Sequence, residues 1–323
     1  MVRTTNVVAH AMPDPIIGSL FTGYGGLDIA VIAAYGGQIA WYSEIESAAC
    51  TVLKQDYPEI SNIGDITKVN WGDVSPVDIL TGGYPCQPFS NAGKRKGVND
   101  ERHLWPHVVD SIDALRPTLV VLENVRGHLT LGFGDVLSDL YKLGYDVKWG
   151  VVRASDAGAP HGRARLFIVA HSHDARRGEH CRTIPIKSQF ASAEYLSDIV
   201  ADSHSDGHGK QLHARGMEGM EKKTTRNTSQ LQRAWGEPDS RVHWGNYAPA
   251  IEQWERITRP APIPTIFTDR PRLNPGFVEW MMGLPQGHVT GHGLSPAQEL
   301  KMLGNGVCPQ QATLALHMLS YSE

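Results

Sequence analysis

The chain has 323 residues, of which 41% are hydrophobic and 20% are charged, and its formal net charge is −4 at pH 7. This length and composition indicate an ordinary globular protein with one large core and a smaller second lobe, or with two domains. The mild negative charge excludes a general basic signature and so counts against a nucleic-acid partner, unless local charge decides otherwise.

The cysteines, Cys50, Cys86, Cys181 and Cys308, are widely spaced and form no C-x-x-C pair. This spacing argues against a disulfide framework and a cysteine zinc site, and it fits a reducing compartment. No stretch reaches the ~18 to 20 apolar residues that a membrane span needs, and the N-terminal stretch has no uninterrupted apolar segment of the signal-peptide kind. We therefore expect a soluble, cytoplasmic protein without a membrane partner.

The first predicted element is a strand over residues 16–21, followed by a glycine-rich turn and a helix that stops at Gly36 and Gly37. Further strands are predicted in QIAWYSEIE, VDILTGGYP and PTLVVLENV, with helical segments such as Leu104 to Leu115 between them. Strands that alternate with helices predict a parallel, doubly wound α/β sheet.

After two more strand patterns, DVKWGVVRA and ARLFIVA, the apolar periodicity fails. From about residue 171 to 268 the chain is rich in His, Arg, Ser, Gly and Thr, which predicts a second lobe or an insertion. Order returns at RLNPGFVEWMMGLP, where Asn274 can cap and Pro275 can open a short helix. A last helix is predicted from Pro309 to about Ser320.

The stretch FTGYGG, residues 21–26, is typical of a nucleotide-binding turn, because glycines let the backbone approach a ligand at a helix N-terminus. Glu44 lies about 20 residues further on, where an acidic side chain can bind a ribose hydroxyl pair. Asp65 could accept a hydrogen bond from an adenine amine. The alternative is a turn needed only for packing, with Glu44 and Asp65 as solvated loop acids.

Reactive side chains follow predicted strands at the sheet edge where ligands of open α/β sheets bind. Cys86 could be a thiolate nucleophile, although a free cysteine is more often a small buried hydrophobe. Glu123 ends the next strong strand, where apolar neighbours could raise its pKa so that it donates a proton. Arg163 and Arg165 alternate as they enter a strand, so they would bind a polar ring or phosphate from one face, or lie on a solvated edge.

Several motifs, LFTGYGG, GGYPCQPFS, ENV, GRAR and LGNGV in this order, closely resemble the DNA cytosine-5 methyltransferase family of the prokaryotic or phage type. The resemblance covers roughly residues 16–170 and 270–323. It implies a Rossmann-like S-adenosylmethionine-dependent methyltransferase domain with a smaller target-recognition lobe. We therefore predict a catalytic and cofactor-binding domain over 1–171, a recognition lobe over 172–268, and a C-terminal segment over 269–323 that returns to the catalytic domain.

The resemblance further implies methylation of C5 of a cytosine in double-stranded DNA, with S-adenosylmethionine as the methyl donor. Cys86 would add to C6 of the ring, and Glu123 would bond N3 and the amino group. Arg165 would contact the ring O2, with Arg163 supporting the loop. Because neither reacting carbon is reachable in a stacked duplex, the base would have to be flipped out.

Other positions match cofactor residues of the family. Phe21 would face the adenine, Glu44 would hold the ribose, and Ile45 would replace the usual tryptophan by aliphatic packing. The rest of the implied cofactor site comprises Thr22, Gly23, Tyr24, Gly26, Asp65, Ile66, Pro85, Leu104 and Asn305. His161 stands where the family usually has glutamine, which would make a loop hydrogen bond pH-dependent.

The segment NAGKRKG, which follows Cys86, resembles the mobile loop of the family that closes on DNA. Lys94, Arg95 and Lys96 would contact phosphates, and Ser90 belongs to the same predicted DNA contact; a solvated charge run is the alternative. The middle segment mixes basic and amide side chains able to read base edges, but it has no recognisable docking motif. Its histidines fit no common zinc spacing, so we predict no metal site.

Two other functions stay open. A tRNA-methylating branch shares these motifs, but PCQPFS lacks the distinctive cysteine-containing signature of that branch, and the long middle segment suits DNA reading. A catalytically silent DNA-binding relative is the second, and the presence of Cys86, Glu123 and Arg165 argues against it. We expect a monomer in the cytoplasm of a bacterial cell or a phage-infected host.

Overall fold

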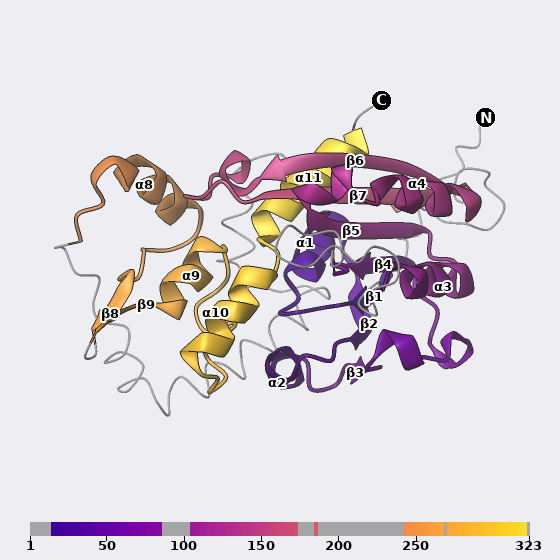
Figure 1. Ribbon diagram of the computed structural model, residues 1–323, viewed down its shortest axis with the longest axis horizontal. Coiled ribbons are helices and arrows are strands. Elements are labelled where there is room, and N and C mark those ends of the chain that lie inside the picture. Colours follow the sequence, from indigo (N-terminus) through magenta and orange to yellow (C-terminus); the bar gives the residue numbers. More distant parts are fainter. Residues whose placement is uncertain (1–13, 86–103, 174–183, 187–241, 268–269, 322–323) are drawn as a thin grey trace, which may run out of the picture.

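The structure, a computed structural model, describes residues 14–85, 104–173, 184–186, 242–267 and 270–321. Its main feature is a seven-stranded sheet with the order β3-β2-β1-β4-β5-β7-β6 (Figure 1). The strands are β1 (Ile16–Leu20), β2 (Gln38–Ser43), β3 (Ser61–Asn62), β4 (Ile79–Gly82), β5 (Leu119–Val125), β6 (Tyr145–Arg153) and β7 (Ala164–Ser172). The predicted Rossmann-like fold is confirmed.

The direction of β7 corrects the expectation of an all-parallel sheet. Strands β1 to β5 pair in parallel, whereas β7 is antiparallel to both β5 and β6. Only residues 154–163 join β6 to β7, and the one regular element among them is the short 3-10 turn η5 (Ala154–Ala157). Because a parallel pair needs a longer crossover connection, this short link produces an antiparallel pair.

The register of the parallel strands aligns their carboxyl ends. Leu20 of β1 pairs with Gly82 of β4, and Gly82 pairs with Leu122 of β5. The residues that follow this row, Phe21 and Glu123 among them, therefore lie at one edge of the sheet. This edge carries the candidate active site.

Helices cover both faces of the sheet. One face is covered by α1 (Gly26–Tyr35) and α11 (Pro309–Tyr321), and the other by α3 (Trp105–Leu115) and α4 (Phe133–Lys142). Successive strand side chains point to opposite faces, so Val121 and Val169 join the first core, whereas Leu122 and Ile168 join the second. Helix α2 (Ser47–Asp56) packs near the β2 edge against Tyr42.

Two predicted helix boundaries are confirmed by the geometry of their ends. Helix α9 (Pro275–Met281) starts with the Asn274 side chain accepting a hydrogen bond from the Gly276 N–H at 3.0 Å, with proline at the first helical position. Helix α11 begins at Pro309, which is the start that the sequence predicted. Both starts depend on local chemistry, which explains why sequence predicted them.

A third core, that of a smaller lobe, lies beside the sheet, in the orange and yellow part of Figure 1. It includes residues of α8 (Ala248–Ile257), α9 and α10 (Pro296–Asn305). The strands β8 (Thr265–Phe267) and β9 (Pro271–Leu273) form a separate antiparallel pair. Trp254 and Trp280 are fully buried at the centre of this smaller core, where the Trp254 indole donates to the Trp280 carbonyl at 2.8 Å. The same core includes Tyr24 and residues of α2, so this lobe packs directly against the sheet domain.

Helix α8 was not predicted, since residues 171–268 were interpreted as a segment without apolar periodicity. Its buried residues Ile251, Trp254 and Ile257 recur at intervals of three, a signal that sequence reasoning missed. Most of the predicted recognition lobe lies outside the described residues, so the domain boundaries stay predictions.

Candidate active site

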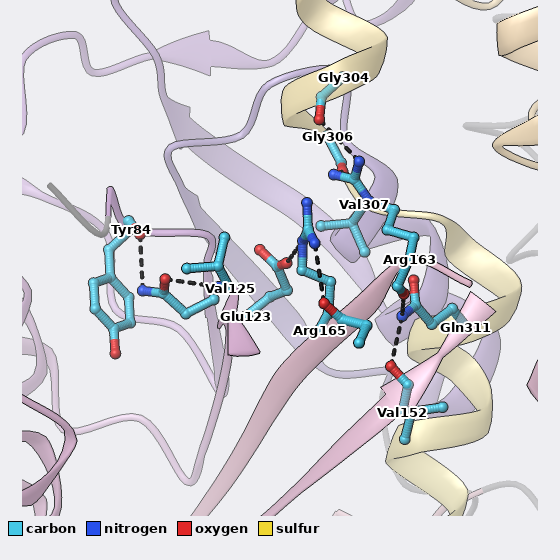
Figure 2. A network of polar contacts seen from close by, with 12 residues as sticks. Tyr84, Glu123, Val125, Val152, Arg163, Arg165, Gly304, Gly306, Val307 and Gln311 are labelled. Carbon is cyan, nitrogen blue, oxygen red and sulfur yellow. Dashed lines mark hydrogen bonds and ion pairs between the residues drawn. The ribbon is translucent and has the colours of Figure 1, made fainter. Parts of the chain in front are cut away.

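The central pair of the site is a carboxyl and a guanidinium that lie on adjacent strands. Glu123 of β5 pairs in register with Phe167 of β7, and Arg165 lies two residues before Phe167, so both side chains point to one face. The Arg165 Nε atom lies 3.0 Å from the Glu123 Oε1 atom (Figure 2). Sequence predicted both residues, and the structure brings them into contact.

Glu123 is only 7% exposed to solvent, and this burial controls its protonation. Burial raises the pKa of Glu123 to about 7, while the charges of Arg165 and Arg163 oppose that rise. Burial also lowers the pKa of Arg165, while the Glu123 carboxylate opposes that fall. Glu123 can therefore hold a proton near neutral pH and release it to a neighbouring group.

Arg163 has different partners from Arg165, although the two guanidiniums are electrostatic neighbours. Its Nη1 and Nη2 atoms donate to the carbonyls of Gly304 and Gly306 at 2.9 and 2.5 Å (Figure 2). The Gln311 side chain donates to the Arg163 carbonyl at 2.7 Å. Arg163 thus attaches the C-terminal segment to the start of β7.

The chain segment before Pro85 is attached to β5 through Asn124. The buried Asn124 side chain donates to the Tyr84 carbonyl at 3.1 Å, and its oxygen accepts from the Val125 N–H at 2.8 Å. The Tyr84 hydroxyl lies 2.8 Å from the His128 Nε2 atom. Asn124 is a positioning residue that sequence reasoning named only as part of the ENV motif.

The predicted nucleophile and the predicted DNA-contacting residues, Cys86, Ser90, Lys94, Arg95 and Lys96, lie outside the described residues. The described chain reaches Pro85 on the carboxyl side of β4 and resumes at Leu104 before α3. Tyr84 and Trp105 pack against each other across this interval, with ring centroids 5.1 Å apart. The two described ends therefore meet at the sheet edge near Glu123.

A pocket opens between the glycine-rich turn, the ends of β1, β4 and β5, and α10; we call it the strand-end pocket. Among its lining residues are several predicted for the cofactor, namely Phe21, Thr22, Gly23, Gly26 and Asn305. Glu123 lines the same pocket. The glycine-rich turn and the Glu123 carboxyl are therefore open to one cavity.

Two glycines allow the C-terminal segment to close over this turn. A Cβ atom at Gly26 would overlap the Val307 carbonyl, and one at Gly306 would overlap the Tyr24 ring. The Tyr24 hydroxyl donates to the Val307 carbonyl at 2.7 Å. Tyr24 is thus a buried link to the C-terminal segment, and its side chain does not line the strand-end pocket.

Beneath the pocket lies a buried acid that sequence reasoning did not single out. Asp28, in the first turn of α1, accepts hydrogen bonds from Ser19 at 2.8 Å and from Thr81 at 2.5 Å. The Ser19 hydroxyl also lies 2.9 Å from the Thr22 hydroxyl. Burial raises the pKa of Asp28 to about 6. An acid in a first helical turn is common, so its sequence position carried no special signal.

Charged residues at the pocket mouth were also missed. Lys301 of α10 and Glu46, which precedes α2, both line the strand-end pocket and form an ion pair of 2.7 Å. This pair joins elements that are far apart in the sequence, so sequence spacing could not have revealed it. Gln298 of α10 lines the pocket beside them.

Glu44 supports the pocket from below the turn. Its carboxylate accepts from the N–H groups of Gly23, Ile45 and Glu46, each at 2.8 Å. Ile45 itself is 68% exposed. Through Gly23, Glu44 links the end of β2 to a residue that lines the pocket.

Four other predicted cofactor residues do not line the strand-end pocket. Asp65 caps the 3-10 turn η1 (Ile66–Lys68) by accepting from the Thr67 N–H at 3.0 Å, and Ile66 is buried in the core next to it. Pro85 is exposed, and Leu104 is half-buried directly before α3. Their assignment to the cofactor stays a prediction.

His161 connects the β6–β7 link to the smaller lobe. Its Nε2 atom donates to the Met281 carbonyl at 2.9 Å, and burial lowers its pKa. A neutral imidazole donates this bond as well as a charged one does, so the bond is expected to persist as the pH rises.

Two further findings concern the part of the chain that the structure describes. No helix in it is both long and apolar enough to cross a membrane. No group of three or more His, Cys, Asp or Glu side chains in it is arranged to hold a metal ion.

Comparison with protein families gives a match along most of the chain. The model of the C-5 cytosine-specific DNA methylase family matches residues 16–317. Type II methyltransferase M.NlaIV of Neisseria lactamica is 43% identical over 139 residues, which cover 39% of this chain and 33% of that protein. The matched part of this chain thus spans a third of the length of M.NlaIV. M.NgoMIV of Neisseria gonorrhoeae, also a Type II methyltransferase, is 28% identical over 81% of this chain and 84% of that protein.

Solved structures resemble the fold at low sequence identity. A putative DNA modification methyltransferase encoded within an E. coli prophage has a TM-score of 0.59 at 19% identity, covering 95% of this chain and 99% of the other. A mutant of Spodoptera frugiperda DNMT2 has a TM-score of 0.54 at 18% identity, and the match covers 94% of this chain and 99% of that protein. At these identities the likeness concerns the fold alone.

Proposed function

This chain belongs to the C-5 cytosine-specific DNA methylase family, and we propose that it methylates C5 of a flipped-out cytosine in double-stranded DNA, with S-adenosylmethionine as the methyl donor. The observation that carries this proposal is the buried Glu123–Arg165 pair, which lies at the strand ends beside the strand-end pocket. A carboxyl that holds a proton next to a fixed guanidinium suits a ring with adjacent acceptor atoms, as in the N3 and O2 of cytosine.

In the proposed mechanism the Cys86 thiolate adds to C6 of the cytosine, and Glu123 gives its proton to N3. The electron pair of the former C5–C6 double bond makes C5 nucleophilic. Once C5 carries the methyl group, loss of the C5 proton to a base reforms the double bond, expels the Cys86 thiolate and returns the N3 proton to Glu123. Arg165 holds Glu123 and contacts O2, with Arg163 supporting it.

The strand-end pocket fits S-adenosylmethionine by the chemistry of its walls. Backbone N–H groups at the start of α1 suit a carboxylate, and the Glu46 carboxylate suits an ammonium group. Phe21 supplies an aromatic wall, and Asn305 lies on the C-terminal side. The bound cofactor supplies the methyl group. We also retain Glu44, Ile45, Tyr24, Asp65, Ile66, Pro85 and Leu104 as proposed cofactor residues.

The proposed substrate is DNA because the matching family is one of DNA methylases and the named relatives are Type II methyltransferases. We propose that residues 172–268 read the target sequence and that Ser90, Lys94, Arg95 and Lys96 contact its backbone. The tRNA alternative has no comparable support, because the matching family is described as one of DNA methylases. A cytoplasmic monomer remains our expectation.

Incubation of the protein with labelled S-adenosylmethionine and either duplex DNA or tRNA tests the proposal. We expect label in DNA at C5 of cytosine, and a denaturation-resistant adduct with a duplex that carries 5-fluorocytosine, since fluorine cannot leave as a proton does. Cys86→Ser should abolish the adduct and retain cofactor binding, because a hydroxyl is a far weaker nucleophile. Methylation by Cys86→Ser, or label in tRNA alone, would contradict the mechanism or the substrate, respectively.

A further inference from the structure

A shallow groove borders the active site on the side of β6 and β7. It is lined by Arg126, Leu129, Val151, Arg153, Asp156 and Ala164, and we call it the arginine groove. Arg126 directly follows β5, the strand of Glu123, and Arg153 is the last residue of β6. Arg153 pairs in register with Ala164, the residue between Arg163 and Arg165. The groove therefore begins at the strand ends that carry the site.

The charge of the arginine groove is positive. Arg126 and Arg153 are exposed, and neither guanidinium forms an ion pair with an Asp or Glu side chain of the described part of the chain. Asp156 is the acid in the lining, and its carboxylate accepts from the backbone N–H of Arg153 at 2.8 Å. Two guanidiniums thus stay available for an anion.

The floor of the arginine groove is apolar. Leu129 and Val151 are 37% and 38% exposed, and Ala164 lies beside them. A sugar–phosphate strand presents apolar deoxyribose carbons together with phosphate oxygens. Guanidiniums bind phosphates through paired hydrogen bonds, so an apolar floor flanked by arginines complements such a strand.

We propose that the arginine groove binds the phosphate backbone of DNA next to the target nucleotide, through Arg126 and Arg153. Neighbouring strands lie about 4.8 Å apart, so the backbones of β5 and β6 are separated by roughly 10 Å, which two arginine side chains can bridge to one phosphate or to consecutive ones. Ala164 and Arg165 point to opposite faces of the sheet. The bound DNA strand would therefore cross the sheet edge, from the face of Glu123 and Arg165 to the face of the arginine groove. The proposal rests on the proposed function in taking DNA as the ligand.

Binding of a fluorescein-labelled duplex, measured by anisotropy over a series of potassium chloride concentrations, tests this contact. Each phosphate contact contributes about 0.9 to the slope of log affinity against log salt. We expect the Arg126→Gln/Arg153→Gln variant to lose roughly two units of that slope and to bind roughly 10- to 30-fold more weakly. The Arg126→Lys/Arg153→Lys variant should keep the slope, because it keeps the charges. Lys54→Gln, an exposed change in the last turn of α2, should bind as the wild type does.

Cofactor binding, measured by calorimetry, checks that each variant is folded. If the double glutamine variant does not fold, the two single glutamine variants test the proposal instead, and each is expected to lose about one unit of slope. An unchanged slope in folded glutamine variants, or weaker binding without a change in slope, would overturn the proposal. Methylation of the same duplex by the wild-type protein is measured in parallel. Methylation with unchanged slopes would contradict this inference alone, whereas the expected slopes without methylation would contradict the proposed function alone.

Discussion

At the scale of single residues, the chemistry of the site depends on which carboxyl groups are buried. Glu123 and Asp28 both lie at the strand-end pocket, and burial raises the pKa of each, to about 7 and about 6, respectively. Glu123 contacts a guanidinium, whereas Asp28 accepts hydrogen bonds from the hydroxyl groups of Ser19 and Thr81. One acid is therefore suited to proton transfer and the other to holding the pocket together.

We predict that the activity of the wild-type protein falls as the pH rises through about 7, because Glu123 then loses the proton that it donates. Glu123→Gln should lower the methylation rate by about 10² to 10⁴-fold and remove this alkaline limb. Rates measured across pH with saturating DNA and cofactor would check it. Glu299→Gln is the matched control, since burial also raises the pKa of Glu299 to about 7, away from the pocket lining. An alkaline limb that persists in Glu123→Gln would contradict the assignment.

Asp28 should make the folded state less stable as the pH rises. Its folded pKa of about 6 exceeds the ordinary value of 3.8, so the folded protein binds more protons between these values and stability falls with rising pH in that window. From about pH 5 to about pH 8 the loss due to Asp28 is roughly 1.4 kcal/mol. Chemical denaturation of the wild type and Asp28→Asn at both pH values should show this difference. Equal pH dependence in the two proteins would exclude Asp28 as its source.

At the scale of elements, the turn between α10 and α11 closes the pocket because it meets the turn before α1. Arg163 binds the Gly304 and Gly306 carbonyls, and the Tyr24 hydroxyl binds the Val307 carbonyl. The close approach leaves no space for a side chain at Gly306. The C-terminal segment thus completes a pocket that the N-terminal segment begins.

We predict that Gly306→Ala weakens binding of S-adenosylmethionine by about tenfold or more. The added methyl group would force the turn away from the Tyr24 ring, and such overpacking typically costs about 1 to 3 kcal/mol. Calorimetric titration would measure the change. Gly304→Ala, in the last turn of α10, is the control, because a Cβ there meets no atom within 4 Å. If both variants bind alike, close packing of this turn does not control cofactor binding.

In the smaller lobe, Glu279 of α9 holds the following loop together. Its fully buried carboxylate accepts from the N–H groups of Gly287, Val289 and Thr290 at 2.9, 2.7 and 3.0 Å. Burial raises the pKa of Glu279, and these hydrogen bonds oppose the rise. The loop from α9 to α10 is therefore organised by one side chain.

Glu279→Gln should cost about 2 to 4 kcal/mol of the free energy of unfolding, because the amide group presents an N–H to backbone N–H donors. Urea denaturation would measure it. Glu252→Gln, an exposed change on α8, should stay within about 0.5 kcal/mol of the wild type. A loss at Glu279 no greater than that at Glu252 would show that the carboxylate is dispensable to the loop.

At the scale of the whole molecule, two hydrophobic cores share residues from both ends of the chain. The smaller core combines Tyr24 and α2 with α8, α9 and α10, while α11 returns to pack against α1 on one face of the sheet (Figure 1). Helix α8 therefore belongs to the packed framework, although it lies within the predicted recognition lobe. An exchange of recognition segments should leave α8 in place.

We predict that replacing residues 187–241 by the corresponding segment of a relative changes the methylated DNA sequence while the rate of methyl transfer stays measurable. Replacing 242–267 as well should instead lower stability, since it removes Trp254 from the smaller core. Mapping of 5-methylcytosine in treated DNA would check the first outcome and thermal unfolding the second. An active exchange protein that methylates the original sequence would place target recognition elsewhere in the chain.

The sequence by itself predicted the main strands of the sheet, the glycine-rich turn, the helices that begin at Pro275 and Pro309, and Glu123 and Arg165 as candidate site residues. These features depend on local periodicity, capping residues and short motifs, which is why the starts of α9 and α11 agree with expectation. Only the tertiary structure decided the direction of β7, the attachment of Arg163 to the C-terminal turn and the burial of Asp28 beneath the pocket. Each of these follows from contacts between segments distant in sequence, whose packing and desolvation no local pattern encodes.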